Sequence, residues 1–319
     1  MPQAERKLIE RIRRLTQNGV GSAVVRGIGD DCAILKVTAG HQLLVTTDLC
    51  IENVHFRRAW HPPASVGHRC LARGLSDIAA MGGDPLACFV SLGLPSRLSQ
   101  QWVDGFLLGL ARLAHQFGVP LAGGDISAAP VITADIVVTG QVPSGKAVLR
   151  SGARPGDRIY VTGALGGSAA VLKRLYAGAR VRPARPRRHF YPLPRLDAGR
   201  WLRQKGLATA MIDLSDGLSV DLAHICQESR VAARIHAGAV PLARGADLEL
   251  ALHGGDDYEL LFTAPAKTAV PSRIAGAAIA EIGVILPASH RKPLVQVVDK
   301  SGRIRRLDPG GWEHFGKKR

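Results

Sequence analysis

The chain is predicted to be a two-domain protein of the mixed α/β or α+β class. Its 319 residues are enough for two hydrophobic cores. Helix-like and strand-like patterns of apolar residues occur together in both halves, as in mixed folds. A turn-rich stretch at 143–156 interrupts these patterns. We therefore expect domains at 1–148 and 149–319.

The N-terminal half is expected to contain three helices. In 4–16, Leu8, Ile9 and Ile12 share one helical face. The helices at 64–81 and 101–117 show similar spacing, and the first carries Asp77 near its end. Strands are expected at 42–47, 86–92, 119–122 and 131–142. The first and third would each lead into an aspartate, Asp48 and Asp125.

The C-terminal half is expected to begin with a strand at 158–162 and a Gly/Ala-rich helix start at 163–170. The Arg- and Pro-rich stretch 182–195 cannot form a regular element, because proline lacks the backbone donor. We predict an exposed loop there. A strand at 209–214, a helix at 217–228 and strands at 258–263, 279–285 and 294–298 follow.

Composition limits the functional classes. The formal net charge is +16, but only 5% of the residues are aromatic, and no nucleic-acid signature is found. We expect neither nucleic acid nor membrane as a partner, since no apolar run reaches membrane-spanning length. The five scattered cysteines are expected to be small buried hydrophobes in a reducing compartment. A soluble cytoplasmic protein is expected.

Six short acidic segments, mostly after apolar runs, carry the strongest functional signal. Their aspartates are flanked by Gly, Ser or Thr. Carboxylates that converge repel one another unless cations lie between them, and Mg²⁺ prefers such oxygen ligands. The set predicts several Mg²⁺ ions and a phosphorylated ligand. The segments are Gly29-Asp30-Asp31, Thr46-Thr47-Asp48, Leu75-Ser76-Asp77, Gly123-Gly124-Asp125, Ile212–Gly217 and Gly254-Gly255-Asp256-Asp257.

Common phosphate-binding motifs are absent from the sequence. Ser144-Gly145-Lys146 lacks the other residues of a P-loop. Gly27-Ile28-Gly29 precedes two aspartates that would repel a pyrophosphate unless metal ions intervened. Protein-kinase motifs are also missing. Any bound nucleotide would therefore need Mg²⁺ to bridge it to carboxylates.

Several other candidates have an ordinary structural alternative. The segment 163–168 opens a helix and would suit either a phosphate or a tight strand–helix turn. His55 is a candidate phosphate contact or a structural histidine, and its spacing to His61 and His68 does not support zinc. Asp256 is either a solvated turn residue or the partner of a cationic ligand. Trp312 is either a ligand contact or a core residue.

Eight ordered segments resemble the thiamine-monophosphate kinase family, over about residues 5–315. A wider superfamily includes aminoimidazole ribonucleotide synthetase, selenophosphate synthetase and a hydrogenase-maturation protein. The segments are 27–35, 46–48 with 53–56, 75–82, 123–125, 150–157, 212–218, 254–262 and 311–315.

The resemblance implies an ATP-dependent kinase that converts thiamine phosphate to thiamine diphosphate. It implies a two-domain aminoimidazole ribonucleotide synthetase-like fold and a homodimer whose N-terminal sheets join in a barrel. It assigns Mg²⁺ to Asp30, Thr46, Thr47, Asp48, Asp77, Asp125, Asp213 and Asp216, with Asp48, Asp125, Asp213 and Asp216 as the catalytic set. It assigns ATP to Gly124, Asp125, Arg150 and Ser215, and thiamine phosphate to His55, Asp256 and Trp312.

Two departures from the family pattern concern the site. Asp256 stands where the family usually has Glu, and Gly74 stands where it usually has Asn. The hypothesis is direct in-line transfer to an anionic phosphate oxygen, with charge neutralised by metal ions and Arg150. Two alternatives stay open: another ATP-dependent enzyme of the superfamily, and a non-enzymatic anion- or nucleic-acid-binding protein.

Overall fold

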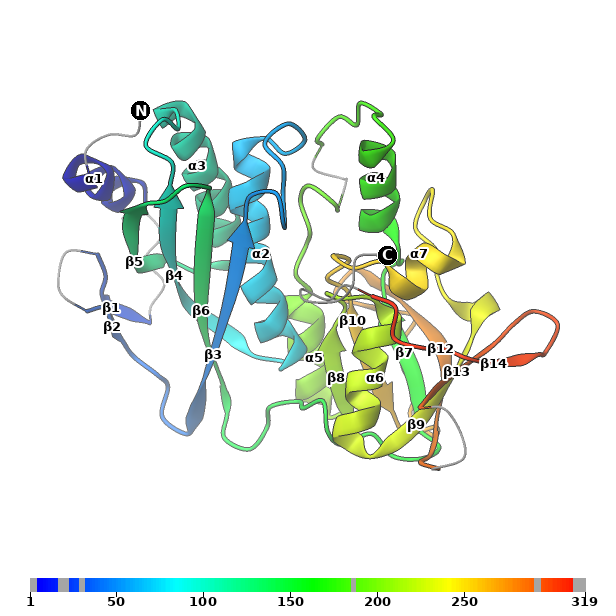
Figure 1. The fold of residues 1–319 in the computed structure, drawn as a ribbon. Helices are drawn as coiled ribbons and strands as arrows, with labels where there is room; N and C mark the ends of the chain where they lie inside the picture. The colour runs from blue at the N-terminus through cyan, green and yellow to red at the C-terminus, as the bar shows by residue number, and fades with distance from the viewer. Residues whose placement is uncertain (1–4, 17–22, 29–31, 185–187, 290–293, 312–319) are drawn as a thin grey trace. The chain divides into compact units, whose positions relative to one another are not determined.

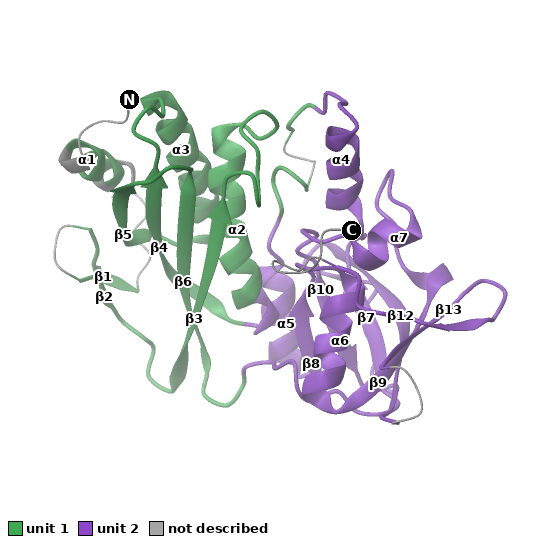
Figure 2. Ribbon diagram, viewed as in Figure 1, with its two compact units in different colours: residues 1–78, 83–146, 182–192 green, residues 79–82, 147–181, 193–319 purple. Residues whose placement is uncertain are grey.

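The computed structural model describes residues 5–16, 23–28, 32–184, 188–289 and 294–311. It divides into two compact units (Figure 2). Unit 1 comprises residues 1–78, 83–146 and 182–192, and unit 2 comprises 79–82, 147–181 and 193–319. One passage from unit 1 to unit 2, between 146 and 147, lies beside the expected boundary, but 79–82 belongs to unit 2 and 182–192 to unit 1, which a single boundary does not allow.

Unit 1 is built on a four-stranded sheet (Figure 1). The β3–β6 and β6–β4 pairs are antiparallel, and β4–β5 is parallel. The expected strands at 42–47 and 119–122 were too short, because Asp48 and Asp125 lie inside strands rather than after them. A separate pair is formed by β1 (Val24–Arg26) and β2 (Ile34–Leu35). The order in the sheet is β3 (His41–Ile51), β6 (Thr133–Pro143), β4 (Asp84–Leu94) and β5 (Leu121–Ala128).

The helices of unit 1 confirm the predicted ones: α1 (Glu5–Thr16), α2 (Pro63–Ala80) and α3 (Gln100–Phe117). Glycines let α2 and α3 touch backbone to backbone. A Cβ on Gly67 would lie 1.9 Å from the Phe106 carbonyl oxygen, and one on Gly109 would lie 1.9 Å from that of Ala64. Larger residues at either position would push the helices apart.

Unit 2 contains an eight-stranded, mostly antiparallel sheet. Its one parallel pair among the described strands is β13–β9. Strand β11 (Arg273–Ile274) pairs with β12 at the side. The main order is β14 (Ile304–Arg306), β13 (Val295–Val298), β9 (Val231–His236), β12 (Ala277–Pro287), β7 (Arg158–Thr162), β10 (Leu260–Ala264) and β8 (Ala210–Asp213).

Helices pack on this sheet, and α6 buries Leu222, Ile225 and Cys226 in the core of the unit. Helix α5 was not predicted, since it follows the proline-rich stretch and contains Gly199. That glycine meets the end of α2, where an added Cβ would lie 2.0 Å from the Ala79 carbonyl oxygen. The helices are α4 (Gly167–Tyr176), α5 (Leu196–Lys205), α6 (Leu218–Ser229) and α7 (Leu248–His253), with a 3₁₀ turn η1 (Ala237–Ala239).

The described parts of the 182–195 stretch, 182–184 and 188–195, are irregular, as expected, but the prediction that the stretch is exposed is wrong for the second part. Phe190 and His189 are buried. The His189 ring nitrogen Nε2 lies 3.2 Å from His61 Nε2, and Arg69 donates to the His189 carbonyl. Aromatic and carbonyl groups thus hold part of this segment against unit 1.

Four cysteines are buried, as predicted, but Cys32 is exposed. Within the described part of the chain, no helix combines the length and the hydropathy needed to cross a bilayer.

Candidate active site

Strand β3 and helix α2 bring together three predicted metal ligands and an arginine. Alternation along β3 places Thr46 and Asp48 on the same face of the sheet. Arg73 and Asp77 are one turn apart on α2 and share its face. Thr46 Oγ1 donates to the Asp77 carboxylate, and Arg73 Nη2 donates to Asp48 Oδ1 at 2.8 Å. We call Thr46, Asp48, Arg73 and Asp77 the strand–helix cluster.

Gly74 explains how α2 comes so close to β3 and β6. A Cβ at this position would lie 2.6 Å from Val138 Cγ2 and 3.6 Å from Thr46 Cγ2. The glycine therefore permits the close approach that forms the cluster. An asparagine, which the resemblance implies for this position, would require the helix to move outward.

Asp125 belongs to the other face of the same sheet. The register aligns Asp48 with Ile136, Val90 and Gly124, and Asp125 with Ser91, Asp135 and Leu49. Cross-strand neighbours point to one face and successive residues to opposite faces. Asp125 is thus not in the strand–helix cluster, and Thr47, by the same alternation, faces away from Asp48.

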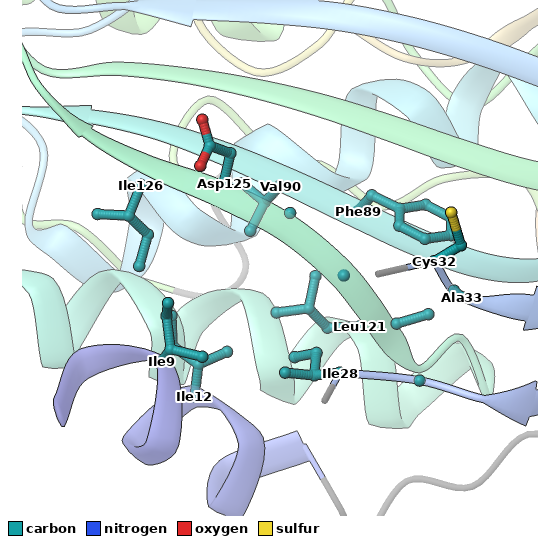
Figure 3. A pocket seen from close by; sticks show the side chains of 14 residues that line it. Ile9, Ile12, Ile28, Cys32, Ala33, Phe89, Val90, Leu121, Asp125 and Ile126 are labelled. Atoms are coloured by element: carbon teal, nitrogen blue, oxygen red, sulfur yellow. The ribbon is translucent and has the colours of Figure 1, made fainter. Parts of the chain in front are cut away.

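Asp125 instead lines a cavity of about 720 Å³ (Figure 3). Among the described residues of the lining, Asp125 carries the charged side chain. Gly123 and Gly124 contribute backbone, and a Cβ on Gly124 would lie 1.9 Å from the Val90 carbonyl oxygen. The apolar part of the lining includes Ile9, Ile12, Ile28, Phe89 and Leu121.

In unit 2, β8 ends at the buried Asp213, and the chain then turns through Ser215 and Asp216 into α6. Asp221, in the first turn of α6, accepts hydrogen bonds from the backbone N–H groups of Asp216 (3.2 Å) and Gly217 (3.1 Å). Burial, reinforced by the charges of Asp213 and Asp216, raises the pKa of Asp221 well above its usual value. Asp221 is therefore close enough to Asp213 and to Asp216 to be repelled by both.

Asp221 was not among the predicted site residues. The sequence feature that could have identified it is an acidic residue in the first turn of the predicted helix, five residues after Asp216. In the structure, Asp221 holds the backbone of the turn between β8 and α6 by accepting from the Asp216 and Gly217 N–H groups.

A second loop, 254–258, lies against this turn. The Asp256 N–H donates to the Ser215 carbonyl (2.8 Å), and the Tyr258 N–H donates to that of Leu214 (2.9 Å). Asp256 and Tyr258 both have left-handed backbones, with φ of 65° and 51°. Tyr258 Oη donates to Asp256 Oδ1 at 2.7 Å. The structure thus brings together the predicted ATP contact Ser215 and the predicted substrate contact Asp256.

The N-terminus of α4 is occupied by a carboxylate of the protein itself. Asp257 accepts from the N–H groups of Gly166 (2.6 Å) and Ser168 (3.4 Å). Burial raises the pKa of Asp257 from 3.8 to about 7. Of the two interpretations of 163–168, this geometry favours the structural turn over the phosphate cradle.

Glu259 anchors the end of the 182–195 stretch. Arg195 donates two hydrogen bonds to its carboxylate, both at 2.6 Å, and Thr162 Oγ1 donates a third at 2.5 Å. The side chains of Arg195 and Glu259 are only 10% and 4% exposed. This bidentate pair links α5 to the 254–259 segment.

The remaining predicted site residues lie as follows. His55 Nδ1 accepts from the Ile51 N–H at 3.0 Å, which orients its ring. The Arg150 carbonyl accepts from Ser229 Oγ at the end of α6 (2.9 Å), whereas Ser215 precedes that helix. The two backbones are thus separated by about the length of α6, roughly 18 Å. Asp30 and Trp312 lie outside the described residues.

No group of three or more His, Cys, Asp or Glu side chains in the described residues is arranged to hold a metal ion by itself. The donor chemistry still suits Mg²⁺, since the Thr46 hydroxyl contacts the Asp77 carboxylate in unit 1 and carboxylates gather at the β8–α6 turn in unit 2. Mg²⁺ is commonly held by one or two carboxylates, with substrate phosphates completing its coordination.

The sequence matches the models of a known family and several characterised proteins. Residues 29–142 match the family "AIR synthase related protein, N-terminal domain", and residues 154–296 match its C-terminal domain. The thiamine-monophosphate kinase of Escherichia coli K12 is 41% identical over 75% of this chain and 76% of its own. That of Bacillus subtilis is 34% identical over 92% of this chain and 94% of its own.

Solved structures give the same result. Thiamine-monophosphate kinase from Stenotrophomonas maltophilia has a TM-score of 0.80 and 36% identity, covering 93% of this chain and 97% of its own. AaThiL complexed with AMPPCP and TMP has a TM-score of 0.77 and 31% identity, covering 98% and 97%. A hydrogenase maturation protein, HypE, shares the fold at 19% identity. The chain therefore belongs to the thiamine-monophosphate kinase family.

Proposed function

We propose that this protein transfers the γ-phosphoryl group of ATP to thiamine phosphate and forms thiamine diphosphate. The observation that carries the proposal is the likeness to AaThiL, a structure complexed with AMPPCP and TMP, over 98% of this chain. Family membership makes the chain a phosphotransferase of this class. The site residues then receive the following roles.

The cavity of unit 1 is the proposed site for the nucleotide. Its volume of about 720 Å³ is in the range of small-molecule sites, roughly 300–1,000 Å³. The apolar lining would receive the base. Asp125 would bind a metal-coordinated phosphate. The predicted ATP contacts Arg150 and Ser215 belong to unit 2.

Thr46, Asp48 and Asp77 in unit 1, and Asp213 and Asp216 in unit 2, are proposed to hold Mg²⁺. Asp30, Thr47 and Asp125 were also predicted ligands, but Thr47 and Asp125 face the opposite side of the sheet from Asp48 and would therefore hold a different ion. When bound, Mg²⁺ neutralises phosphoryl oxygens and so lowers the repulsion between two polyanionic substrates. The protein's own contribution is to fix these oxygens on β3, α2 and the β8–α6 turn.

The acceptor needs no general base, because its attacking atom is an anionic phosphate oxygen. His55, Asp256 and Trp312 are proposed to position thiamine phosphate. The Asp256 carboxylate is already oriented by its hydrogen bond from Tyr258 and by its left-handed backbone. Its side chain is one methylene shorter than that of Glu, but its direction is fixed before any ligand binds. Transfer is proposed to be direct and in line.

The open face of the unit 1 sheet is proposed to pair with a second copy of the chain. Along β3, Leu43, Val45 and Leu49 alternate with inward residues and are 48%, 59% and 50% exposed. An apolar strand face of this kind is typical of an interaction surface. A homodimer whose two sheets form a barrel would cover it.

The test is product identification. Purified protein is incubated with ATP and Mg²⁺, together with either thiamine phosphate or unphosphorylated thiamine. Thiamine diphosphate is expected from the first acceptor and no phosphorylated product from the second. ATP turnover without thiamine diphosphate would favour another activity of the superfamily instead.

A further inference from the structure

Arg73 lies inside the set of oxygens that the proposed function assigns to Mg²⁺. Its Nη2 is 2.8 Å from Asp48 Oδ1, and the two side chains are only 17% and 22% exposed. It precedes Asp77 by one helical turn, so both residues approach β3 from the same face of α2. A fixed cation is thus built into a candidate cation site.

The guanidinium group stays protonated under all ordinary conditions. It therefore opposes a divalent cation at the same carboxylate in two ways. It occupies one carboxylate oxygen, and it repels the incoming charge. For partly buried groups about 4 Å apart, such repulsion is strong enough to change an affinity by orders of magnitude.

We propose that Arg73 is a positioning residue that keeps Asp48 paired in the nucleotide-free enzyme and weakens its binding of free divalent cation. The metal ion then enters together with the nucleotide. This inference rests on the proposed role of Asp48 as a metal ligand, and it adds an order of binding that the role alone does not imply.

Nucleotide phosphates would make binding of the divalent cation at Asp48 favourable in spite of the Arg73 charge. Each adds negative charge that compensates for the second cation, and guanidinium groups pair readily with phosphate oxygens. A phosphate that reaches the Asp48 face of the sheet, beyond the cavity at Asp125, would give Arg73 a second partner, so that it would not be left as an unpaired, half-buried charge.

The experiment measures Mn²⁺ binding without nucleotide, by electron paramagnetic resonance of the free ion. Arg73→Met keeps the apolar stem and removes the charge, and Arg73→Gln is a second neutral variant. Both are expected to bind Mn²⁺ at least about 10-fold more tightly than wild type. Arg73→Lys keeps the charge and is expected to remain near wild type.

Two matched variants make the readout specific. Arg11→Met breaks another 2.8 Å ion pair of unit 1, Arg11–Asp104, and is expected to leave the Mn²⁺ affinity unchanged. Adding Asp48→Asn to Arg73→Met is expected to abolish the gain. A purely structural role for Arg73 would lower thermal stability without tightening Mn²⁺ binding.

The inference is overturned if both neutral variants bind Mn²⁺ no better than wild type. It is also overturned if the gain persists in the double variant, since it would then not act through Asp48. Failure of the proposed function would show separately, as the absence of thiamine diphosphate in the wild-type assay.

Discussion

The position of Asp48 within a strand fixes the orientation of its carboxylate. It lies in the middle of β3, where the flanking pleat holds its direction and Arg73 holds its carboxylate. A strand is more rigid than the turn that the sequence suggested. A metal ligand in such a place is already oriented before any ion binds.

Replacing Asp48 by Asn is expected to lower kcat/KM for thiamine phosphate by roughly 10²–10³-fold, because a charged ligand to the transferring phosphates is lost. The fold should persist, since Asn keeps an oxygen that can accept from Arg73. Steady-state kinetics and thermal unfolding measure the two effects. Near-normal turnover by a folded variant would refute the metal role.

Asp257 is expected to make stability depend on pH. Its folded pKa, raised by burial from 3.8 to about 7, lies above its unfolded value. Its contribution is therefore present at low pH and is lost as pH rises toward 7. Between pH 5 and 8 the wild type should lose about 2–3 kcal/mol relative to Asp257→Asn.

Urea unfolding of both proteins at pH 5 and pH 8 measures this difference. Asn keeps an acceptor for the Gly166 N–H but does not titrate. Parallel pH dependence of the two unfolding free energies would show that Asp257 does not titrate in this range.

At the scale of elements, apolar periodicity was enough to predict α1, α2, α3 and most strands of both units. It could not predict α5, whose Gly199 is explained only by contact with Ala79. It also could not show that 182–195 is partly buried, because His189, Phe190 and Arg195 find their partners far away in the sequence. Long-range pairing decides these elements, and one sequence does not contain that information.

The candidate site was also predictable only in part, because local sequence patterns identify single residues but not their distant partners. Local signals singled out Thr46, Asp48, Asp77, Asp213 and Asp216. They could not tell that Asp125 lies on the other face of the sheet, which depends on register. They also missed Arg73 and Asp221, whose importance comes only from the carboxylates and N–H groups that the fold places beside them.

The Arg195–Glu259 pair is expected to be the main link between α5 and the 254–259 segment. Removing one partner of a buried, bidentate pair leaves an uncompensated charge and typically costs about 3–5 kcal/mol. Glu259→Gln should therefore destabilise unit 2 by this order in urea unfolding.

The matched control is Glu281→Gln, since Glu281 pairs with Arg158 at 3.6 Å with both side chains about half exposed. That variant should cost no more than about 1 kcal/mol. Equal losses from Glu259→Gln and Glu281→Gln would mean that the buried pair has no special role.

At the scale of the whole molecule, the exposed side of β3 should decide the oligomeric state. Val45→Glu places a charge in the apolar face and is expected to produce monomers, because burying an unpaired carboxylate is costly. Leu242→Glu, at a similarly exposed position in unit 2, should leave the assembly unchanged. Sedimentation velocity distinguishes the two, and a wild-type monomer would contradict the proposed dimer.

The central claim is that the scattered aspartates bind divalent ions that carry the phosphoryl groups. Anomalous diffraction from crystals with Mn²⁺, a non-hydrolysable ATP analogue and thiamine phosphate tests it most directly. The expected result is Mn²⁺ bound both to phosphoryl oxygens and to carboxylates among Asp48, Asp77, Asp213 and Asp216. Bound nucleotide whose metal ions touch none of these side chains would contradict the account.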